Sequence, residues 1–154
     1  MAKQLSSEVK VTDIKIKNSE LHAWENVMIN THGWYVHLIP STVNKDIMDI
    51  HTHGIKESFG HDDFQIVAPL PDITAQSIFA SFIDRIKAGE KFVNNQIVSK
   101  IIGGYEVKLV NAIESDRIVL RIILPDKYGK LDIVSIESPF HLQYADLITN
   151  VMVH

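Results

Sequence analysis

The chain has 154 residues, 45% hydrophobic and 22% charged, with a formal net charge of −4 when histidine is counted as neutral. This length and composition predict one domain over residues 1–154, with a core large enough to fold without disulfides or a structural metal. There are no cysteines, which excludes disulfides, thiolate catalysis and cysteine-ligated metals, and the negative charge argues against nucleic acid as a partner.

The first third of the chain predicts a strand, a helix and two further strands. Residues 9–16 alternate between apolar and polar types, apart from an irregularity at residues 12–13, and so predict a first strand. A helix is predicted from residue 18 or 19 to about Thr31, with Gly33 just past its end. Then follow a strand over residues 34–39, a loop centred on residues 41–45 and a strand over residues 47–53.

The rest of the chain predicts one helix among further strands. Residues 64–68 are a short apolar run typical of a buried strand, and apolar residues at spacings of three and four predict an amphipathic helix that ends at Gly89. Further strands are predicted over residues 97–101, 105–113, 117–124 and 131–136, with turns at residues 114–116 and 125–129, and the segment from Phe140 fits either strand or helix. Hairpin-linked strands with two helices indicate an α+β fold, a mainly antiparallel sheet with two packed helices.

Three histidines and two aspartates lie within thirteen positions, in the segments His51-Thr52-His53 and Gly60-His61-Asp62-Asp63. Side chains two apart on a strand point to the same face, so His51 and His53 are expected to project together. Two imidazoles suit a divalent metal such as zinc, nickel, iron or copper, and a third ligand would leave one position open. Such a site would support hydrolysis or oxygen chemistry.

The candidate metal ligands are therefore His51, His53 and His61, with Glu57 and the neighbouring aspartates as other sources of the third ligand. The candidate catalytic pair is His61 with Asp63, because a carboxylate can hold an imidazole in one tautomer for proton transfer. The other interpretation is a polar cluster without metal, in which the imidazoles bond backbone groups and solvent.

Glycines and tryptophans near this cluster also allow two interpretations. Gly54 and Gly60 bracket a segment that is either a loop folded over a ligand or an ordinary strand connection. Trp24 and Trp34 favour packing in the core or at an edge over a ligand platform.

Several short motifs follow one another in an order that resembles a known family. They are Gly33-Trp34 at a strand start, Thr52-x-Gly54-Ile55, Gly60-His61-x-Asp63, the helix end Ala88-Gly89-Glu90-Lys91-Phe92, and Pro125-Asp126-x-x-Gly129. The family is the bacterial domain-of-unknown-function family numbered 4262, and the resemblance covers about residues 20–146. No established activity comes with it, so it implies the fold and the location of the site.

The chain also departs from the pattern of that family. Thr-Ile-Gly-Leu stands in the family where this chain has Thr52-His53-Gly54-Ile55, and His-Pro-Glu stands where it has His61-Asp62-Asp63. A Pro-Trp pair often follows the last glycine, where this chain has Leu131-Asp132. The histidine at His53 is thus a feature of this chain, whereas His61 and the acid at Asp63 match the motif.

Two functions follow from these observations. The first is a bacterial domain that binds a small molecule or a divalent metal through the His/Asp cluster, either as an enzyme or as a binding protein. The second is a non-catalytic protein-interaction or immunity-type module in which the His/Gly loop is structural. Apolar residues persist through residues 147–153 and indicate a possible homodimer, and the lack of an 18-residue apolar run or of a signal-peptide core predicts no membrane partner and a cytoplasmic location.

Overall fold

The structure is a computed structural model that describes residues 11–40, 47–145 and 147, with the backbone alone for residues 11–19. In chain order its elements are α2 (Val11–His32), β1 (Tyr35–Pro40), β2 (Met48–His53), α3 (Ile55–Phe59), β3 (Phe64–Ala68), α4 (Asp72–Lys87), β4 (Ile97–Ile102), β5 (Tyr105–Glu114), β6 (Arg117–Ile123) and the 3-10 helix η1 (Phe140–Tyr144).

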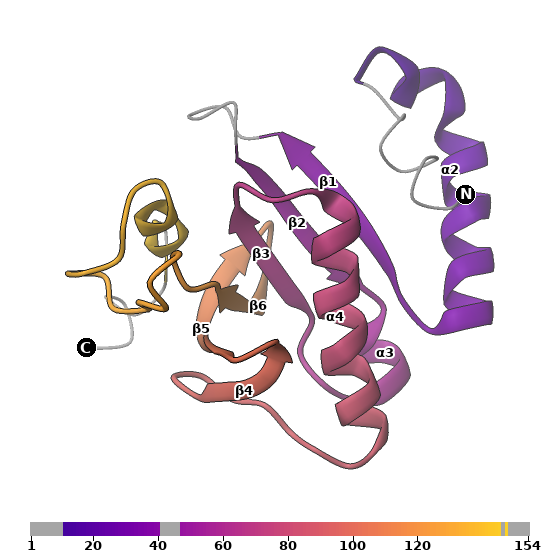
Figure 1. Ribbon diagram of the computed structural model, residues 1–154. Coiled ribbons are helices and arrows are strands. Elements are labelled where there is room, and N and C mark those ends of the chain that lie inside the picture. Colours follow the sequence, from indigo (N-terminus) through magenta and orange to yellow (C-terminus); the bar gives the residue numbers. More distant parts are fainter. Residues whose placement is uncertain (1–10, 41–46, 146, 148–154) are drawn as a thin grey trace.

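The strands form one six-stranded sheet in the order β1-β2-β3-β6-β5-β4. Neighbouring strands are antiparallel except β3 and β6, which run parallel. Helix α4 lies across one face of the sheet, as Figure 1 shows. The predicted α+β class with a mainly antiparallel sheet is therefore confirmed, and the parallel β3–β6 pair is the one departure from simple hairpin pairing among the described strands.

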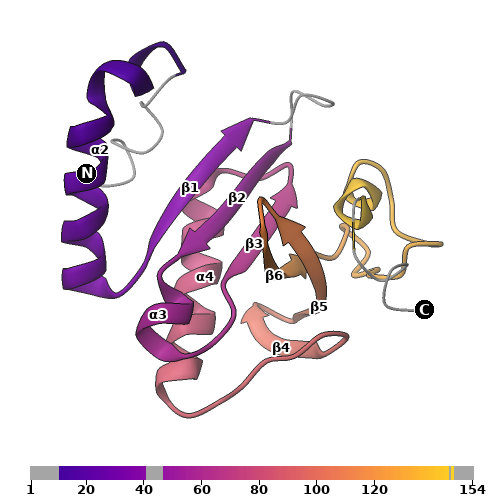
Figure 2. The same cartoon turned by 180° about the vertical axis from the view of Figure 1, so that it is seen from behind.

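The hydrophobic core lies between α4 and this face of the sheet. The helix buries Ala75, Ile78, Phe79 and Phe82, which the spacing of three and four had indicated, and also Ile83, whereas the fifth predicted residue, Ile86, is partly buried. Fully buried strand residues such as Ile50, Phe64 and Leu120 pack in the same cluster. Because side chains alternate along a strand, the residues between them project from the opposite face, which Figure 2 shows from behind.

The predicted strand over residues 9–16 is wrong from Val11 onward, because these residues begin helix α2; residues 9 and 10 lie outside the described chain. Val11 and Ile14 are three positions apart, and the same spacing recurs at Leu21 and Trp24. The helical period was therefore present in the segment that had been interpreted as an irregular strand.

Helix α2 lies beside the edge strand β1, so α4 alone of the two predicted helices covers a sheet face (Figures 1 and 2). The described side chains of α2, residues 20–32, are half-buried or exposed. Within the described ranges, none of the helices is both long enough and apolar enough to traverse a membrane.

The segment between Gly54 and Gly60, predicted as a loop over a ligand or a strand connection, is the short helix α3. Both glycines have left-handed backbone angles, with φ of 101° at Gly54 and 69° at Gly60. A Cβ at Gly54 would lie 2.4 Å from Ile29 Cδ1 and 2.6 Å from the carbonyl oxygen of Gly33. Gly54 is therefore required for the close approach of α3 to the end of α2.

The predicted strand over residues 131–136 is also wrong, because these residues form turns. Asp126 organises this segment: its Oδ1 accepts hydrogen bonds from the backbone N–H groups of Tyr128 and Lys130, and its Oδ2 accepts one from Glu137, each at 2.9 Å. These bonds fix the two ends of the segment, and within it the N–H groups of Ser135 and Ile136 donate to the carbonyl of Asp132. The turn predicted at residues 125–129 is confirmed.

The last described residues return to the sheet. Segment η1 contacts β3, and Leu147 forms an isolated antiparallel bridge with Ala112 of β5. Leu147 therefore lies against the sheet of its own chain. The loop predicted around residues 41–45 and the apolar residues 148–153 lie outside the described residues.

Candidate functional site

His51 and His53 project together from β2, as the sequence predicted. Their ring centroids are 5.0 Å apart, on the face of the sheet opposite α4. Asp49 shares this face, whereas Ile50 and Thr52 between them are buried on the core side. His51 is 1% exposed and His53 is half-buried.

A third histidine, His37 of β1, completes the cluster and was missed by the sequence analysis. The antiparallel register places His37 directly opposite His51. Its ring centroid is 4.4 Å from that of His53 and 5.6 Å from that of His51. One ligand nitrogen from each of the three histidines lies within 4.8 Å of the other two.

Three carboxylates surround these histidines. Asp49 Oδ1 lies 3.0 Å from His51 Nδ1, and Glu114 Oε2 lies 3.5 Å from His51 Nε2. Glu25 of α2 reaches across to β1, where its Oε2 lies 2.8 Å from His37 Nε2. The two closest contacts fix the orientation of the His51 and His37 rings.

Burial and neighbouring charges set the protonation of the cluster. Burial, together with the positive charge of Arg117, lowers the pKa of His53 to about 3, so this imidazole is neutral at pH 7. Burial acts to raise the pKa of Asp49, but hydrogen bonds from His51 and Gln65 outweigh it and hold that pKa below the usual value. The pKa of Glu114 is also lowered, because the hydrogen bond from Arg117 and the charge of His51 outweigh burial.

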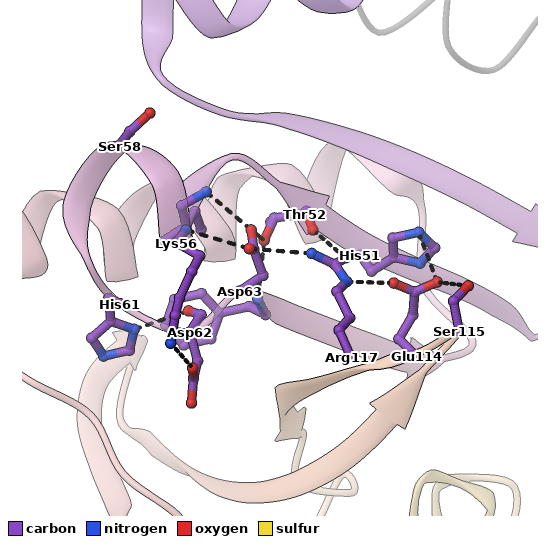
Figure 3. A network of polar contacts seen from close by, with 12 residues as sticks. His51, Thr52, Lys56, Ser58, His61, Asp62, Asp63, Glu114, Ser115 and Arg117 are labelled. Carbon is purple, nitrogen blue, oxygen red and sulfur yellow. Dashed lines mark hydrogen bonds and ion pairs between the residues drawn. The ribbon is translucent and has the colours of Figure 1, made fainter.

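Asp63 is 3% exposed and sits at the corner between β2, α3 and β6 (Figure 3). Its Oδ1 accepts hydrogen bonds from Thr52 Oγ1 at 2.7 Å and from the Ile55 N–H at 3.1 Å, and its Oδ2 pairs with Arg117 Nη1 at 3.2 Å. Burial raises the pKa of this carboxyl even though each of these contacts acts to lower it. Both oxygens of this predicted catalytic residue are engaged in holding the corner together.

His61, predicted as a metal ligand and as a partner of Asp63, lies apart from the other two predicted ligands. Its Nδ1–H donates to the carbonyl of Asp62 at 2.9 Å, and its Nε2 accepts from the Phe92 N–H at 3.0 Å. The ring stacks on Phe64 with centroids 5.4 Å apart. Both ring nitrogens are therefore occupied by hydrogen bonds within the fold. Figure 3 shows His61 and His51 at opposite ends of the drawn network.

Arg117 joins the Asp63 corner to the histidine cluster and was not predicted. Its Nε donates to Glu114 Oε1 at 2.7 Å, and its Nη2 donates to the carbonyl of Thr52 at 2.6 Å. On the far side of the cluster Gln65 donates to Asp49 at 3.0 Å and accepts from Arg121 Nε at 2.8 Å. One connected polar network thus crosses four strands.

Acidic groups outnumber basic ones around the histidines. Among the described residues, the network and the neighbouring His37–Glu25 pair include four carboxylates, Glu25, Asp49, Asp63 and Glu114, and two guanidinium groups, Arg117 and Arg121. This excess of carboxylates favours the binding of a cation.

The fold and the site define an α+β domain with a histidine–carboxylate network on the sheet face opposite its core helix. The sequence matches the family described as Domain of unknown function (DUF4262) over residues 28–120, more than half of the chain, and the protein belongs to this family. The resemblance predicted from the motifs is confirmed, over a shorter region than residues 20–146. No curated protein and no solved structure matches the chain.

Four of the five motifs that carry the family resemblance meet in space around α3, whereas Pro125-Asp126-x-x-Gly129 forms the turn after β6. Thr52 donates to Asp63, Ser58 Oγ donates to the carbonyl of Gly33 at 2.8 Å, and the Phe92 N–H donates to His61. These contacts fix α3 against β2, α4 and the end of α2. The three-histidine cluster lies beside this corner and uses residues outside the motifs, apart from the position of His53.

Proposed function

We propose that this protein binds a divalent transition-metal ion such as Zn²⁺ through His37, His51 and His53. The observation that carries the proposal is the convergence of their three ligand nitrogens within 4.8 Å. Neutral imidazole nitrogen is a preferred ligand of zinc, copper and nickel. The three histidines come from two hydrogen-bonded strands, so their relative positions are held by the sheet ladder.

The geometry requires a small contraction. Zinc–nitrogen bonds of ~2.0–2.1 Å place tetrahedral ligand nitrogens about 3.3 Å apart, so the nitrogens, which lie within 4.8 Å of one another, must approach by up to about 1.5 Å when the ion binds. His51 is fully buried, whereas the His37 side chain is 33% exposed and His53 is half-buried. Rotation of these two side chains toward His51 supplies the contraction.

The carboxylates that contact the histidines also support the metal proposal. A histidine that binds a metal almost always donates its other ring N–H to a carboxylate, a backbone carbonyl or water. Asp49 occupies this position on His51 Nδ1, and Glu25 occupies it on His37 Nε2. His37 Nδ1 and His51 Nε2 would then face the ion, and Glu114, whose Oε2 lies 3.5 Å from His51 Nε2, would give up that contact when the ion binds.

Three imidazoles leave a fourth position on zinc, and an ion with such an open position acts as a Lewis acid toward a bound substrate. The more exposed members of the cluster, His37 and His53, mark the side from which a small molecule reaches the site. The protein's own contribution is to hold three neutral ligands and the surrounding negative charge in place.

Isothermal titration of chelator-treated, tag-free protein with Zn²⁺ tests the proposal. We expect one ion per chain for the wild type, and at least about 100-fold weaker binding after His37→Gln, His51→Gln or His53→Gln, because each removes a direct ligand. His61→Gln and the surface change His22→Gln serve as matched controls and keep wild-type affinity. No binding by the wild type, or equal loss in the His61→Gln variant, contradicts the proposal.

The interaction-module interpretation is a second candidate, and one observation favours it. Ile113 of β5 and Ile118 of β6 lie directly opposite each other and are 52% and 53% exposed. A neighbouring pair of exposed large apolar side chains is the kind of surface that protein partners cover. Light scattering tests self-association: a dimer lost in Ile118→Thr supports it, and a monomer at all concentrations contradicts it.

A further inference from the structure

A pocket of about 210 Å³ lies between α2, β1 and α4, separate from the ligand nitrogens of the histidine cluster. It is lined by Trp24, Met28, His32, Trp34, Tyr35, Val36 and Gln76. These include both tryptophans of the chain, Trp24 in α2 and Trp34 just before β1, which line the same space. We propose that this pocket binds a small uncharged aromatic molecule with one hydrogen-bonding group.

The size of the pocket fits one or two fused rings. An apolar cavity of about 150 Å³ in another protein accommodates a benzene molecule, and this pocket is larger. Trp24 and Tyr35 already contact each other edge to face, with centroids 5.8 Å apart and planes at 72°. Aromatic walls at such angles offer both ring faces and ring edges to a further ring.

The charge of the lining selects an uncharged ligand. None of the seven lining residues is an acid, a lysine or an arginine, and the one histidine, His32, is exposed to solvent, so a charged molecule would lose its hydration without gaining a buried ionic partner. The amide of Gln76 is half-buried and makes no hydrogen bond to any other residue in the described part of the chain. It can therefore donate to and accept from a hydroxyl, amide or ring N–H group of the ligand.

Tyr35 forms the wall between this pocket and the histidine cluster. Its ring stacks on His53 with centroids 5.3 Å apart and lies 5.2 Å from the His37 ring. Burial and the nearby charge of Glu25, the same carboxylate that contacts His37, raise the pKa of its hydroxyl to about 12. The aromatic site is thus adjacent to the proposed metal site but requires none of its ligands.

The test uses 5-fluoroindole as the probe and metal-free protein kept in chelator, so that its result is independent of the metal proposal. Titration followed by ¹⁹F NMR is expected to show saturable binding with a Kd on the order of 0.1–1 mM, as is usual for a ligand of this size. 5-Fluoroindole-2-carboxylate, which carries a charge, is expected to bind at least about 10-fold more weakly.

Two variants of α2 form the matched comparison. Met28→Trp fills the pocket and is expected to weaken 5-fluoroindole binding at least about 10-fold, whereas Val27→Trp, at a neighbouring position that is 59% exposed, leaves it unchanged. Gln76→Leu keeps the volume but removes the amide, and is expected to weaken binding several-fold. Absence of saturable binding to the wild type, or equal binding by the Met28→Trp and Val27→Trp proteins, overturns the proposal.

Discussion

The two oxygens of Asp63 hold together groups from three elements: Thr52 of β2, Ile55 of α3 and Arg117 of β6. Each donor would be left without this acceptor if the carboxylate were removed, and unsatisfied buried donors are more costly than a lost surface contact. The acid that matches the family motif is therefore a structural residue of the corner beside the histidines.

Replacement of this carboxylate should destabilise the fold strongly. We expect Asp63→Ala to lower the free energy of unfolding by roughly 2–4 kcal/mol, because it leaves buried donors and part of the Arg117 charge unpaired. Asp63→Asn should cost less, since it keeps the oxygen to which Thr52 and the Ile55 N–H donate. Urea denaturation measures both.

Asp62→Ala is the matched control, because the neighbouring Asp62 pairs with Lys56 at 3.2 Å on the surface. An exposed pair of this kind contributes within about 0.5 kcal/mol. If the Asp63→Ala and Asp62→Ala proteins unfolded at the same urea concentration, the structural role of Asp63 would be refuted.

His53 makes stability depend on pH in the acid range. Its pKa is about 3 in the folded protein, against 6.5 for an unperturbed imidazole, so below pH 6.5 the unfolded chain takes up a proton that the folded chain does not. Stability is therefore lost as the pH falls. Between pH 7 and pH 5 we expect a loss of about 1 kcal/mol from this residue, after allowance for solvent screening of a half-buried group.

The measurement is the difference in unfolding free energy between the wild type and His53→Phe, taken in chelator across this pH range. Phenylalanine preserves the ring that stacks on Tyr35 but cannot be protonated. The wild-type curve should fall more steeply toward pH 5, and two parallel curves would contradict the low pKa of His53.

At the scale of elements, α3 depends on the two glycines that enclose it in different ways. A side chain at Gly54 would collide with Ile29 and with the carbonyl of Gly33, whereas a side chain at Gly60 would meet nothing within 4 Å. Both positions have positive φ. The backbone conformation is therefore a shared cost of substitution, and the steric clash belongs to Gly54 alone.

This difference predicts unequal effects of the same substitution. Gly60→Ala should destabilise the protein by about 1 kcal/mol through backbone strain, and Gly54→Ala by roughly 3 kcal/mol because overpacking is added. Thermal unfolding of the two variants side by side gives the comparison. A smaller loss for Gly54→Ala than for Gly60→Ala would show that the contact between α3 and the end of α2 is not close.

Local patterns in the sequence were sufficient for the strands and for α4, because each has a clear period and a glycine or turn at its end. They failed at residues 11–16, where a spacing of three also fits an interrupted alternation, and at residues 131–136, where backbone N–H groups bond back to the carbonyl of Asp132 instead of pairing with a strand. The short helix α3 has too few residues to show a period.

Two of the three histidines of the cluster could be predicted from local pattern, and the third could not. His51 and His53 share a face because of alternation along one strand, which a sequence displays. His37 joins them through the register between β1 and β2, and a hairpin that pairs Pro40 with Met48 also pairs residue 37 with residue 51. His61 is near in the sequence, but α3 intervenes and its ring turns toward Phe92.

At the scale of the whole molecule, the two faces of the sheet carry different kinds of side chains. The face under α4 holds the apolar core, and the opposite face holds a continuous polar network from Asp63 through Arg117, Glu114 and His51 to Asp49. Because the ladder fixes the strands, the core on one face positions the histidines on the other. The carboxylates around the histidines outnumber the described guanidinium groups and favour a cation at the centre of the cluster.

X-ray absorption spectroscopy of the zinc-loaded protein at the zinc edge tests this central claim most directly, because it reports the ligands of the ion itself. We expect three imidazole nitrogens at ~2.0–2.1 Å from the zinc ion. The number of imidazole ligands should fall to two in the His37→Gln protein and stay at three in the His61→Gln protein. A zinc environment of oxygen ligands with at most one imidazole, or an imidazole lost on His61→Gln, would contradict it.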